Sequence, residues 1–424
     1  MTTNINAPIA IIGIGARLPG GANSPNKFWQ LLLQGYNGIS TAPASRWDAS
    51  YFHDPDNEGL VGKYIQDKGG WLKGYEIDEV DLQFFHFSPR EAKLLDPNQR
   101  LLLEITYETL EDAGLTLPEI NGTRTGVFVG ISATDYSHLQ FPDVNTIDAH
   151  TQTGISTSIV ANRLSYFYNL LGPSFIVDTA CSSTLVALNC ACQSIRSGES
   201  RSALCGAVNL MMFPEITIGF SKLGVLSPDG QCKAFDASAN GYVRSEGAGM
   251  ILLKPLSDAE RDGNRILAVI RGTATCSDGK MNQQMTSPSE EQQEWLFDRV
   301  LRESNVFPSE VNYVEAHGTG TLVGDPIECK SISQVLNVGR EKLRPVVIGS
   351  VKSNVGHLEP AAGIVSIIKV AYALKHNLIP PTISVHTLNP RIDMKALNLK
   401  IATQLQPFPS PAYENQPRTA MISA

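Results

Sequence analysis

The sequence predicts an α/β protein in which helices cover layered sheets. Strand-like runs of β-branched residues alternate with helical patterns along most of the chain. Several of these helical patterns begin at capping residues followed by proline, as in Ser88-Pro89 and Asp96-Pro97. The chain has 424 residues, of which 42% are hydrophobic and 18% charged, so it can build a large core and more than one domain's worth of structure.

The first half, residues 1–256, starts with a short strand and contains two capped helices. Residues 37–80 are rich in Gly, Asp and Pro, which predicts a long surface excursion with little regular structure. Gly114 ends the helix that starts at Asp96. A further helical segment is expected at residues 154–166. Strands are predicted at residues 9–14, 125–130, 175–177, 202–210 and 249–254.

The second half, residues 257–424, repeats the alternation. Ser289 caps a helix that runs through Leu301, and Asp325-Pro326 is another capped start. A third helix carries Ile364, Ile368, Ala371 and Leu374. Strands are predicted at residues 265–270, 311–315 and 346–351. The Pro-containing residues 407–411 predict an extended strap over the surface.

Cys181 lies at a break between a predicted buried strand, Phe175–Val177, and a helix whose apolar residues begin at Leu185. Free backbone N–H groups and the positive end of the helix dipole would lie beside its thiol. That environment lowers a thiol's pKa and makes it nucleophilic. The alternative is a buried structural cysteine, which position alone leaves equally open.

Composition and charge exclude several classes of function. A formal net charge of -8 gives no reason to expect nucleic acid or an anionic membrane as a partner, and no apolar run reaches the length of a membrane span. The N-terminus lacks the features of a signal peptide. The seven cysteines are odd in number and scattered, as in a reduced cytosolic protein; Cys190 and Cys192 point to different helix faces, which disfavours a zinc site. The glycines of residues 13–20 do not match the dinucleotide fingerprint.

Three reactive groups follow three predicted strands and precede three helices. They are Cys181, His317 and the pair Lys352 and His357. Sites in α/β sheets form beyond the carboxyl ends of strands, so the three strand ends would suit a single site, although the sequence alone does not bring them together. Each histidine could instead be a satisfied core or surface imidazole, but glycines beside both let another group approach the backbone closely.

Four motifs give the chain a resemblance to β-ketoacyl synthase domains, above all the ketosynthase domains of type I polyketide synthases. They are Asp178-Thr-Ala-Cys-Ser-Ser, Glu315-Ala-His-Gly-Thr-Gly-Thr, Gly324-Asp-Pro-Ile-Glu328 and Lys352-Ser-Asn-Val-Gly-His357. Supporting stretches include Ser88–Ala92, Asp96–Arg100, Cys232–Asp236 and Gly241–Arg244. The resemblance runs from about residue 8 to the end of the chain, in the family's order and spacing.

The resemblance implies a thiolase-like layered αβαβα fold made of two similar halves, normally a cytoplasmic homodimer. Cys181 would take an acyl group from a thioester on the phosphopantetheine arm of an acyl carrier protein, and no cofactor would be bound directly. His317 and His357 would favour decarboxylation of a malonyl-type extender, and its carbanion would attack the acyl-Cys181 thioester in a Claisen condensation. The setting would be polyketide or fatty-acid-like biosynthesis, with an acyltransferase or other synthase domains adjacent in the full-length protein.

Secondary roles also follow from the resemblance. Lys352 would support His317 electrostatically, although a surface lysine is the alternative. Thr319 and Thr321 match positions that line the phosphopantetheine tunnel, yet they would suit a plain turn equally well. Asn354 is a further substrate-binding candidate. Asp325 is expected to cap a helix and not to be catalytic.

The resemblance stops at Arg418–Ala424, where relatives continue into a Phe-Gly-Phe-Gly-Gly-Thr-Asn segment and final strands. We expect a fragment of a longer synthase that condenses poorly alone, because that loop supplies an oxyanion N–H. The alternatives are a non-elongating or acyl-hydrolysing enzyme of this fold, or a truncated protein that serves only as a scaffold. A hydrolase would want an Asp or Asn orienting its histidine; the presence of Cys181 argues against the scaffold.

Overall fold

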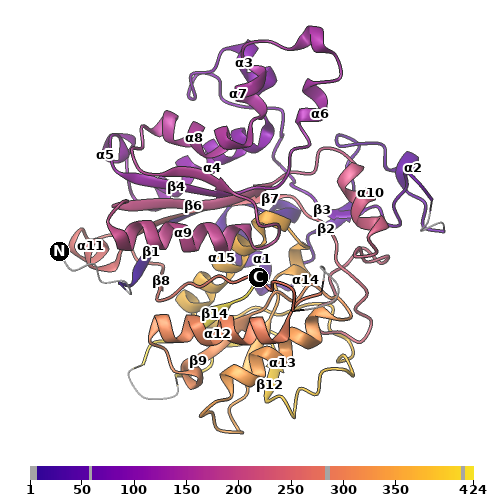
Figure 1. The fold of residues 1–424 in the computed structure, drawn as a ribbon, viewed down its shortest axis with the longest axis vertical. Helices are drawn as coiled ribbons and strands as arrows, with labels where there is room; N and C mark the ends of the chain where they lie inside the picture. Colours follow the sequence, from indigo (N-terminus) through magenta and orange to yellow (C-terminus); the bar gives the residue numbers. More distant parts are fainter. Residues whose placement is uncertain (1–6, 57–59, 282–286, 412–415) are drawn as a thin grey trace.

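A computed structural model describes residues 7–56, 60–281, 287–411 and 416–424. Two sheets lie one above the other with helices outside and between them (Figure 1). The first sheet has the strand order β5-β4-β6-β7-β1-β8, and the second has the order β12-β10-β9-β14. The predicted α/β class and its layered arrangement are confirmed.

The six-stranded sheet is mixed. Strands β5, β4 and β6 run parallel, whereas β7, β1 and β8 pair antiparallel with their neighbours. Its strands are β1 Ile9–Arg17, β4 Thr125–Gly130, β5 Ser174–Val177, β6 Ser202–Asn209, β7 Gly247–Pro255 and β8 Ala268–Ile270. β8 lies after residue 257 yet belongs to this first sheet. The division of the chain into halves at that residue stays a prediction.

All pairings in the four-stranded sheet are parallel. Its strands are β9 Val311–Glu315, β10 Val346–Gly349, β12 Leu399–Ile401 and β14 Thr419–Ile422. Two small antiparallel ribbons join β2 Ile39–Thr41 to β3 Lys68–Gly70, and β11 Leu378–Ile379 to β13 Gln406–Pro407. The predicted strap therefore includes a short paired strand, and Phe408 after it is buried.

Helices form the other three layers. One outer layer comprises α4 Pro97–Asp112 and α8 Thr157–Tyr168, the other α12 Glu290–Ser304 and α13 Gly324–Leu336; between the sheets lie α9 Ser183–Ser197 and α15 Ala362–His376 (Figure 1). The remaining helices are α1 Pro25–Leu33, α2 Ala49–Phe52, α3 Pro89–Leu94, α5 Leu117–Ile120, α6 Ser137–Gln140, α7 Thr151–Ile155, α10 Glu215–Lys222, α11 Leu256–Arg261 and α14 Lys352–Val355, with 3-10 turns at Pro19–Gly21, Val144–Thr146, Pro308–Glu310 and Glu359–Ala361. No helix among the described residues has the length and apolar character needed to cross a membrane.

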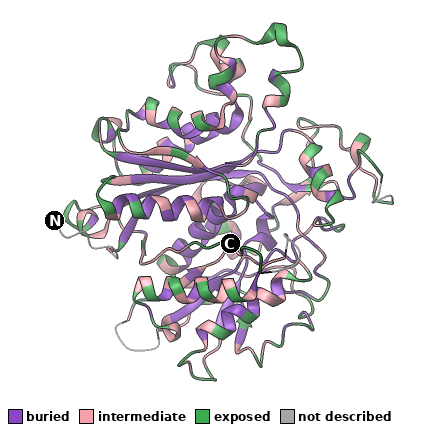
Figure 2. Cartoon of the chain, viewed as in Figure 1, coloured by how far each residue is buried: buried purple, intermediate pink, exposed green. Residues whose placement is uncertain are grey.

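The hydrophobic core lies between the layers, and Figure 2 shows both sheets buried within the molecule. One apolar cluster fills the space between the sheets around α9 and α15, and two others lie under the outer helices. The middle helices approach closely because Gly363 has no side chain: a Cβ there would lie 2.9 Å from that of Thr184. The start of α9, next to Cys181, is thereby held against α15.

Most predicted helix starts are confirmed by their caps. The side chains of Ser88, Asp96 and Ser289 accept backbone N–H groups of the first turns of α3, α4 and α12. The helix expected at residues 154–166 is interrupted at Ser156, which lies between α7 and α8. The strand expected at 265–270 is shorter, because pairing with β1 begins at Ala268.

Two predictions about exposure are wrong. β5 is an edge strand in which only Val177 is buried, because β4 covers one side alone. The excursion of residues 37–80 has little regular structure, as predicted, but Tyr64 and Trp71 are buried. Gly70 donates its N–H to the carbonyl of Arg244 at 3.0 Å, which ties this segment to the interior.

Candidate active site

Cys181 lies in a tight turn between β5 and α9. The preceding Ala180 has a left-handed backbone with φ of 53°. The N–H groups of Ser182 and Ser183 donate to the carbonyls of Thr179 and Ala180. The side-chain hydroxyl of Ser183 braces the same turn, accepting the N–H of Thr179 and donating to the carbonyl of Ala180. The turn presents the thiol just before the helix, as the sequence predicts.

The predicted lowering of the Cys181 pKa is wrong. Burial raises the pKa of the Cys181 thiol above its ordinary value, and the positive charge of Lys352 only partly opposes this. α9 begins at Ser183, and the first N–H groups of the turn already bond to backbone carbonyls. The backbone N–H groups of Cys181 and Ser182 also lower the pKa of the thiol, but burial outweighs them.

His317 follows β9 in a loop held by the carboxylate of Glu328. Oε1 of Glu328 accepts the N–H of His317 at 2.7 Å, and Oε2 accepts the N–H of Gly318 at 2.9 Å. Gly318 has a φ of 42°, and a Cβ there would lie 2.7 Å from that of Ser350. Both the backbone angle and the lack of space require glycine next to the histidine.

Lys352 lies in the short helix α14 after β10 and is buried. Its Nζ donates to the carbonyl of His317 at 2.7 Å. Burial lowers the pKa of Lys352, while the carboxylates of Glu328 and Glu315 act in the opposite direction. The alternative of a surface lysine is excluded by this burial. Lys352 joins the loops that carry the two histidines.

The ring of His357 has a defined tautomer. Its Nδ1 accepts the backbone N–H of Glu359 at 3.0 Å. A backbone amide can only donate, so Nδ1 must carry the lone pair and a neutral ring bears its proton on Nε2. Burial, together with the charge of Lys352, lowers the pKa of His357 well below its usual value. The side chain is therefore a neutral donor through Nε2.

The structure brings Cys181, His317 and His357 together. The sulfur and one nitrogen of each ring all lie within 4.8 Å of one another. The two imidazoles meet edge to face, with centroids 5.6 Å apart. Burial lowers the pKa of His317 well below its usual value too. The site therefore combines a thiol with two neutral imidazoles.

Cysteine and histidine are also zinc ligands, so this cluster has the residue types of a metal site. A metal bound to Nε2 of His357 needs a lone pair on that atom. The hydrogen bond from Glu359 to Nδ1 leaves the proton on Nε2 instead. The donor set does not fit a metal in this arrangement.

The three substrate-binding candidates lie in the segments that follow β9 and β10. Thr319 is buried, and its hydroxyl donates to that of Thr321 at 3.4 Å. The hydroxyl of Thr321 also accepts the N–H of Gly324. Asn354 is fully buried and donates to the carbonyl of Tyr36 at 2.9 Å. Contact of these residues with substrate stays a prediction, and the observed bonds of Asn354 are those of a residue that shapes the fold.

Asp325 does not cap α13, which corrects the sequence prediction. The cap position is Val323, and Asp325 lies within the first turn. Its carboxylate accepts the N–H groups of Phe235 and Gly320 from neighbouring loops. Burial raises the pKa of Asp325 to about 7.

Sequence reasoning missed several residues that hold the site. Glu328 anchors the loop of His317, and Glu315 accepts the N–H of Val351 next to Lys352. Arg244 binds the carboxylate of Glu359, whose N–H holds His357. Glu328 and Arg244 both lie in stretches that carried the family resemblance, and that was the available signal.

Family models match most of the chain. Residues 6–259 match the β-ketoacyl synthase N-terminal domain, and residues 267–386 match the C-terminal domain of the same family. The chain belongs to the β-ketoacyl synthase family. The predicted resemblance, the thiolase-like fold and the acyltransferase class of enzyme are confirmed.

Among curated relatives, the chain is similar to proteins of a mycobacterial polyketide synthase. It is 46% identical over 421 residues to one protein of the phenolphthiocerol/phthiocerol polyketide synthase of Mycobacterium tuberculosis, covering 98% of this chain and 19% of that protein. It is 43% identical over 421 residues to a different protein of the same synthase from Mycobacterium bovis, covering 99% of this chain and 22% of that protein. The ketosynthase therefore spans about a fifth of the length of these relatives.

Solved ketosynthase structures share the fold closely. The oxazolomycin ketosynthase domain of Streptomyces albus JA3453 superposes with a TM-score of 0.92 at 37% identity, covering 98% of this chain and 71% of that chain. The ketosynthase from module 6 of the bacillaene synthase of Bacillus subtilis 168 has a TM-score of 0.88 at 37% identity, covering 98% and 69%. This ketosynthase thus resembles polyketide synthase domains in both sequence and structure.

Proposed function

We propose that this ketosynthase catalyses a decarboxylative Claisen condensation between an acyl group held on Cys181 and a malonyl-type extender on a carrier protein. The observation that carries the proposal is the meeting of the Cys181 sulfur with two imidazoles within 4.8 Å. Covalent catalysis divides one difficult carbon–carbon bond formation into two easier steps.

In the first step, the sulfur of Cys181 attacks the acyl thioester on the phosphopantetheine arm. The new carbon–sulfur bond forms, the old one breaks, and the proton lost by Cys181 ends on the departing thiol. The raised pKa of Cys181 means that little thiolate exists before substrate arrives. Deprotonation is thus coupled to attack, with the charge of Lys352 stabilising the thiolate.

In the second step, the extender loses CO2. The carbon–carbon bond to its carboxylate breaks, and the electron pair moves through Cα onto the thioester oxygen as an enolate. Nε2–H of His357 is a donor suited to that oxygen, because Nδ1 is already occupied by Glu359. His317 lies beside it, with an Nδ1 that is buried and has no bonding partner among the described residues. Removing one such donor typically costs about 10²–10³ in rate.

In the third step, the enolate carbon attacks the acyl carbonyl on Cys181. A carbon–carbon bond forms, and the carbon–sulfur bond breaks. Cys181 leaves as a thiolate and recovers a proton from solvent. The β-ketoacyl product stays on the carrier protein, and no oxidant or cofactor is needed.

The geometry argues against acyl hydrolysis. A Cys–His hydrolase needs a histidine whose Nδ1–H donates to an acid or amide, so that Nε2 can remove a proton. His357 has the opposite tautomer, because its Nδ1 accepts from Glu359. Its Nε2 is a donor, which suits an enolate and not the activation of water.

The test follows the two half-reactions. The protein is incubated with an acyl thioester, and mass spectrometry locates the added acyl mass. Malonyl carrier protein is then added, and CO2 release and product are followed. We expect acylation at Cys181 followed by condensation. Acyl transfer without condensation would favour hydrolysis or a non-elongating role, and a condensing Cys181→Ala variant would overturn the mechanism.

We also propose an acyl carrier protein as the substrate-bearing partner and a cytoplasmic location. Further synthase domains would lie in the same polypeptide, because the relatives are about five times as long as this chain. A homodimer is supported by the open edge of β5, where Phe175 is exposed. Tyr166 and Leu171 expose further apolar surface just before this strand. Light scattering after gel filtration would measure the mass; a monomer at high concentration would contradict dimerisation.

A further inference from the structure

An ion pair between a buried arginine and a partly buried glutamate lies next to His357. Both Nε and Nη2 of Arg244 donate to the two carboxylate oxygens of Glu359, with Nη2 2.9 Å from Oε2. Nη1 donates to the hydroxyl of Thr217 at 2.7 Å. The guanidinium lies over the ring of Phe220, 5.4 Å from its centroid. Its orientation is therefore fixed by three different groups.

Glu359 holds a backbone conformation that its side chain must stabilise. Its φ is 51°, in the left-handed region that residues with a Cβ rarely adopt. This conformation accompanies the bond from its N–H to Nδ1 of His357. The carboxylate accepts the bidentate contact with Arg244 and a longer one, at 3.4 Å, from Asn209. The side chain thus tethers the residue whose backbone faces the ring.

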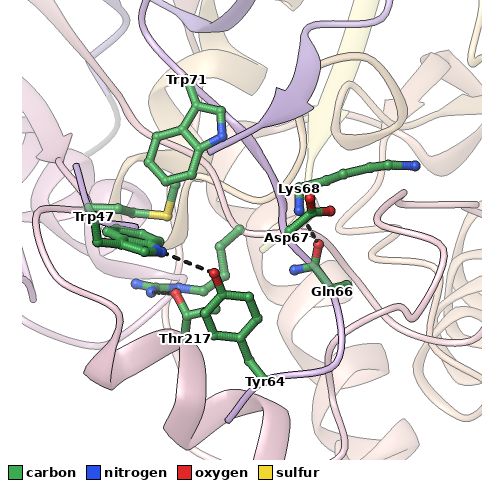
Figure 3. A pocket seen from close by; sticks show the side chains of 9 residues that line it. Trp47, Tyr64, Gln66, Asp67, Lys68, Trp71 and Thr217 are labelled. Atoms are coloured by element: carbon green, nitrogen blue, oxygen red, sulfur yellow. Dashed lines mark hydrogen bonds between the residues drawn. The ribbon is translucent and has the colours of Figure 1, made fainter. Parts of the chain in front are cut away.

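The excursion of residues 37–80 closes over Arg244. Trp47, Tyr64 and Trp71 gather around a cavity of about 10 Å³ that Thr217 and Arg244 also line, and Trp47 donates to the hydroxyl of Tyr64 (Figure 3). That volume is close to the space of a single water. Bulk water is kept from the guanidinium, so its contact with the carboxylate is stronger than at a surface.

Resting on the function proposed above, we propose that Arg244 and Glu359 are positioning residues that fix the tautomer of His357. Arg244 holds the carboxylate, the carboxylate holds the strained backbone, and that backbone donates to Nδ1. In this chain of contacts neither Arg244 nor Glu359 contacts the reacting atoms, and both act through His357. The result is a proton kept on Nε2, where the enolate oxygen develops.

The backbone of Arg244 supports the same ring. Val243 accepts the N–H of His357 at 2.7 Å, and Ser245 donates to its carbonyl at 2.9 Å. Arg244 thus lies between the two residues that hold the main chain of His357. Its side chain holds Glu359 on the other side. Loss of the side chain alone should leave the main-chain contacts intact and release the tautomer.

Nitrogen-15 NMR on histidine-labelled protein reads the tautomer directly, because protonated and unprotonated ring nitrogens differ in chemical shift. We expect Nδ1 of His357 to be unprotonated in the wild type. In Arg244→Gln and Glu359→Ala, a second population with a proton on Nδ1 should appear. Malonyl decarboxylation should fall about ten- to a hundredfold, as for displaced catalytic groups. Acylation of Cys181 should change by less than about threefold.

Glu359→Gly gives the sharpest comparison with Glu359→Ala. Glycine adopts a left-handed backbone without penalty, so its N–H can still reach Nδ1. We therefore expect Glu359→Gly to retain more of the wild-type tautomer and rate than Glu359→Ala. If Arg244→Gln fails to fold, this comparison carries the test. The control is Arg17→Gln, which breaks a bidentate pair with Glu108 outside the site and should leave tautomer and rates unchanged.

The outcomes separate the two proposals. An unchanged His357 tautomer in folded Glu359→Ala would overturn the positioning role. Equal loss of acylation and decarboxylation, with the tautomer intact, would mean that the pair only supports the fold. A changed tautomer with unchanged decarboxylation would keep the positioning role and remove His357 from the proposed mechanism.

Discussion

Replacing Lys369 with methionine should destabilise the protein strongly, because it strands a buried carboxylate. Lys369 and Glu315 are both fully buried, and Nζ lies 2.7 Å from Oε2. The same carboxylate accepts the hydroxyl of Tyr313 at 2.5 Å and the N–H of Val351 at 2.7 Å. These last two contacts satisfy lone pairs but carry no positive charge.

The magnitude follows from which contacts remain. Removing one partner of a buried ion pair typically costs about 3–5 kcal/mol, since the other charge stays desolvated. In Lys369→Met, the bonds from Tyr313 and Val351 persist, so we expect the lower part of that range, about 3 kcal/mol. Neutralising the carboxylate as well, in Lys369→Met with Glu315→Gln, should recover about 1–3 kcal/mol.

Urea unfolding, followed by both circular dichroism and tryptophan fluorescence at one protein concentration, measures these differences from the transition midpoints. The matched control is Arg299→Met, which removes the cation of an exposed pair with Glu303 one turn away on α12. That pair is open to water, so the expected loss is below about 1 kcal/mol.

Two results would refute the reasoning. One is a Lys369→Met protein within about 1 kcal/mol of the wild type, which would mean that water reaches Glu315. The other is a double variant no more stable than Lys369→Met. Either would show that the ion pair does not set the cost of burying Glu315.

The remaining predictions concern the centre itself. Because burial raises the pKa of Cys181, its alkylation by iodoacetamide should keep accelerating as pH rises through the ordinary thiol range, and Lys352→Met should slow it at every pH. Peptide mass spectrometry measures both rates. A rate that levels off at about pH 7 would contradict the direction of the pKa shift. Glu328→Ala leaves the N–H groups of His317 and Gly318 unpaired, so we expect a loss of about 1–3 kcal/mol in urea unfolding. Glu328→Gln should lose less, because its amide oxygen still accepts one N–H, and equal losses in the two variants would count against this account.

The regular elements could largely be predicted because their signals are local. Ser88 and Ser289 begin helices through a side-chain bond three residues away, which is visible in any short window of sequence. β4 and β9 were predicted at their observed bounds, since short β-branched runs between turn residues define them. The break at Ser156 between two adjacent helices carries no comparable signal.

Exposure could not be predicted with the same success, because it depends on neighbours distant in sequence. Phe175 belongs to a β-branched and aromatic run that is typical of a buried strand, yet β5 lies at the edge of its sheet. Tyr64 belongs to a polar, glycine-rich segment but is buried beside Thr217 and Arg244, which are more than a hundred positions away. Strand order decides the exposure of Phe175, and the packing of a loop segment against distant residues decides the burial of Tyr64. Local composition shows neither.

At the active site, too, some features could be predicted from the sequence and others could not. His317 and His357 follow β9 and β10, which pair in parallel in the second sheet, so placing both at one sheet edge follows from the strand pattern. Cys181 follows β5 of the first sheet, and its approach to the histidines depends on how the two sheets stack, which the sequence alone does not show. The direction of the Cys181 pKa shift could not be predicted, since burial around the thiol outweighs the nearby charge. The tautomer of His357 depends on Glu359, whose unusual backbone angle becomes visible only in three dimensions.

The buried charges of this ketosynthase act on backbone more than on reactive atoms. Glu328 holds the N–H groups of the His317 loop, Glu315 holds the N–H next to Lys352, and Glu359 uses its own N–H to hold His357. Two of these carboxylates have a buried cation of their own, Lys369 and Arg244. Burying such pairs is costly, and well-packed apolar residues would often stabilise a fold as well. What apolar residues could not do is accept backbone N–H groups at fixed positions. The carboxylates of Glu328 and Glu315 therefore lower stability relative to well-packed apolar residues and in return fix the positions of loops. The carboxylate of Glu359 instead binds the side chain of Arg244, and its backbone N–H holds His357. The rigidity of the catalytic centre thus depends on charges that need not contact substrate.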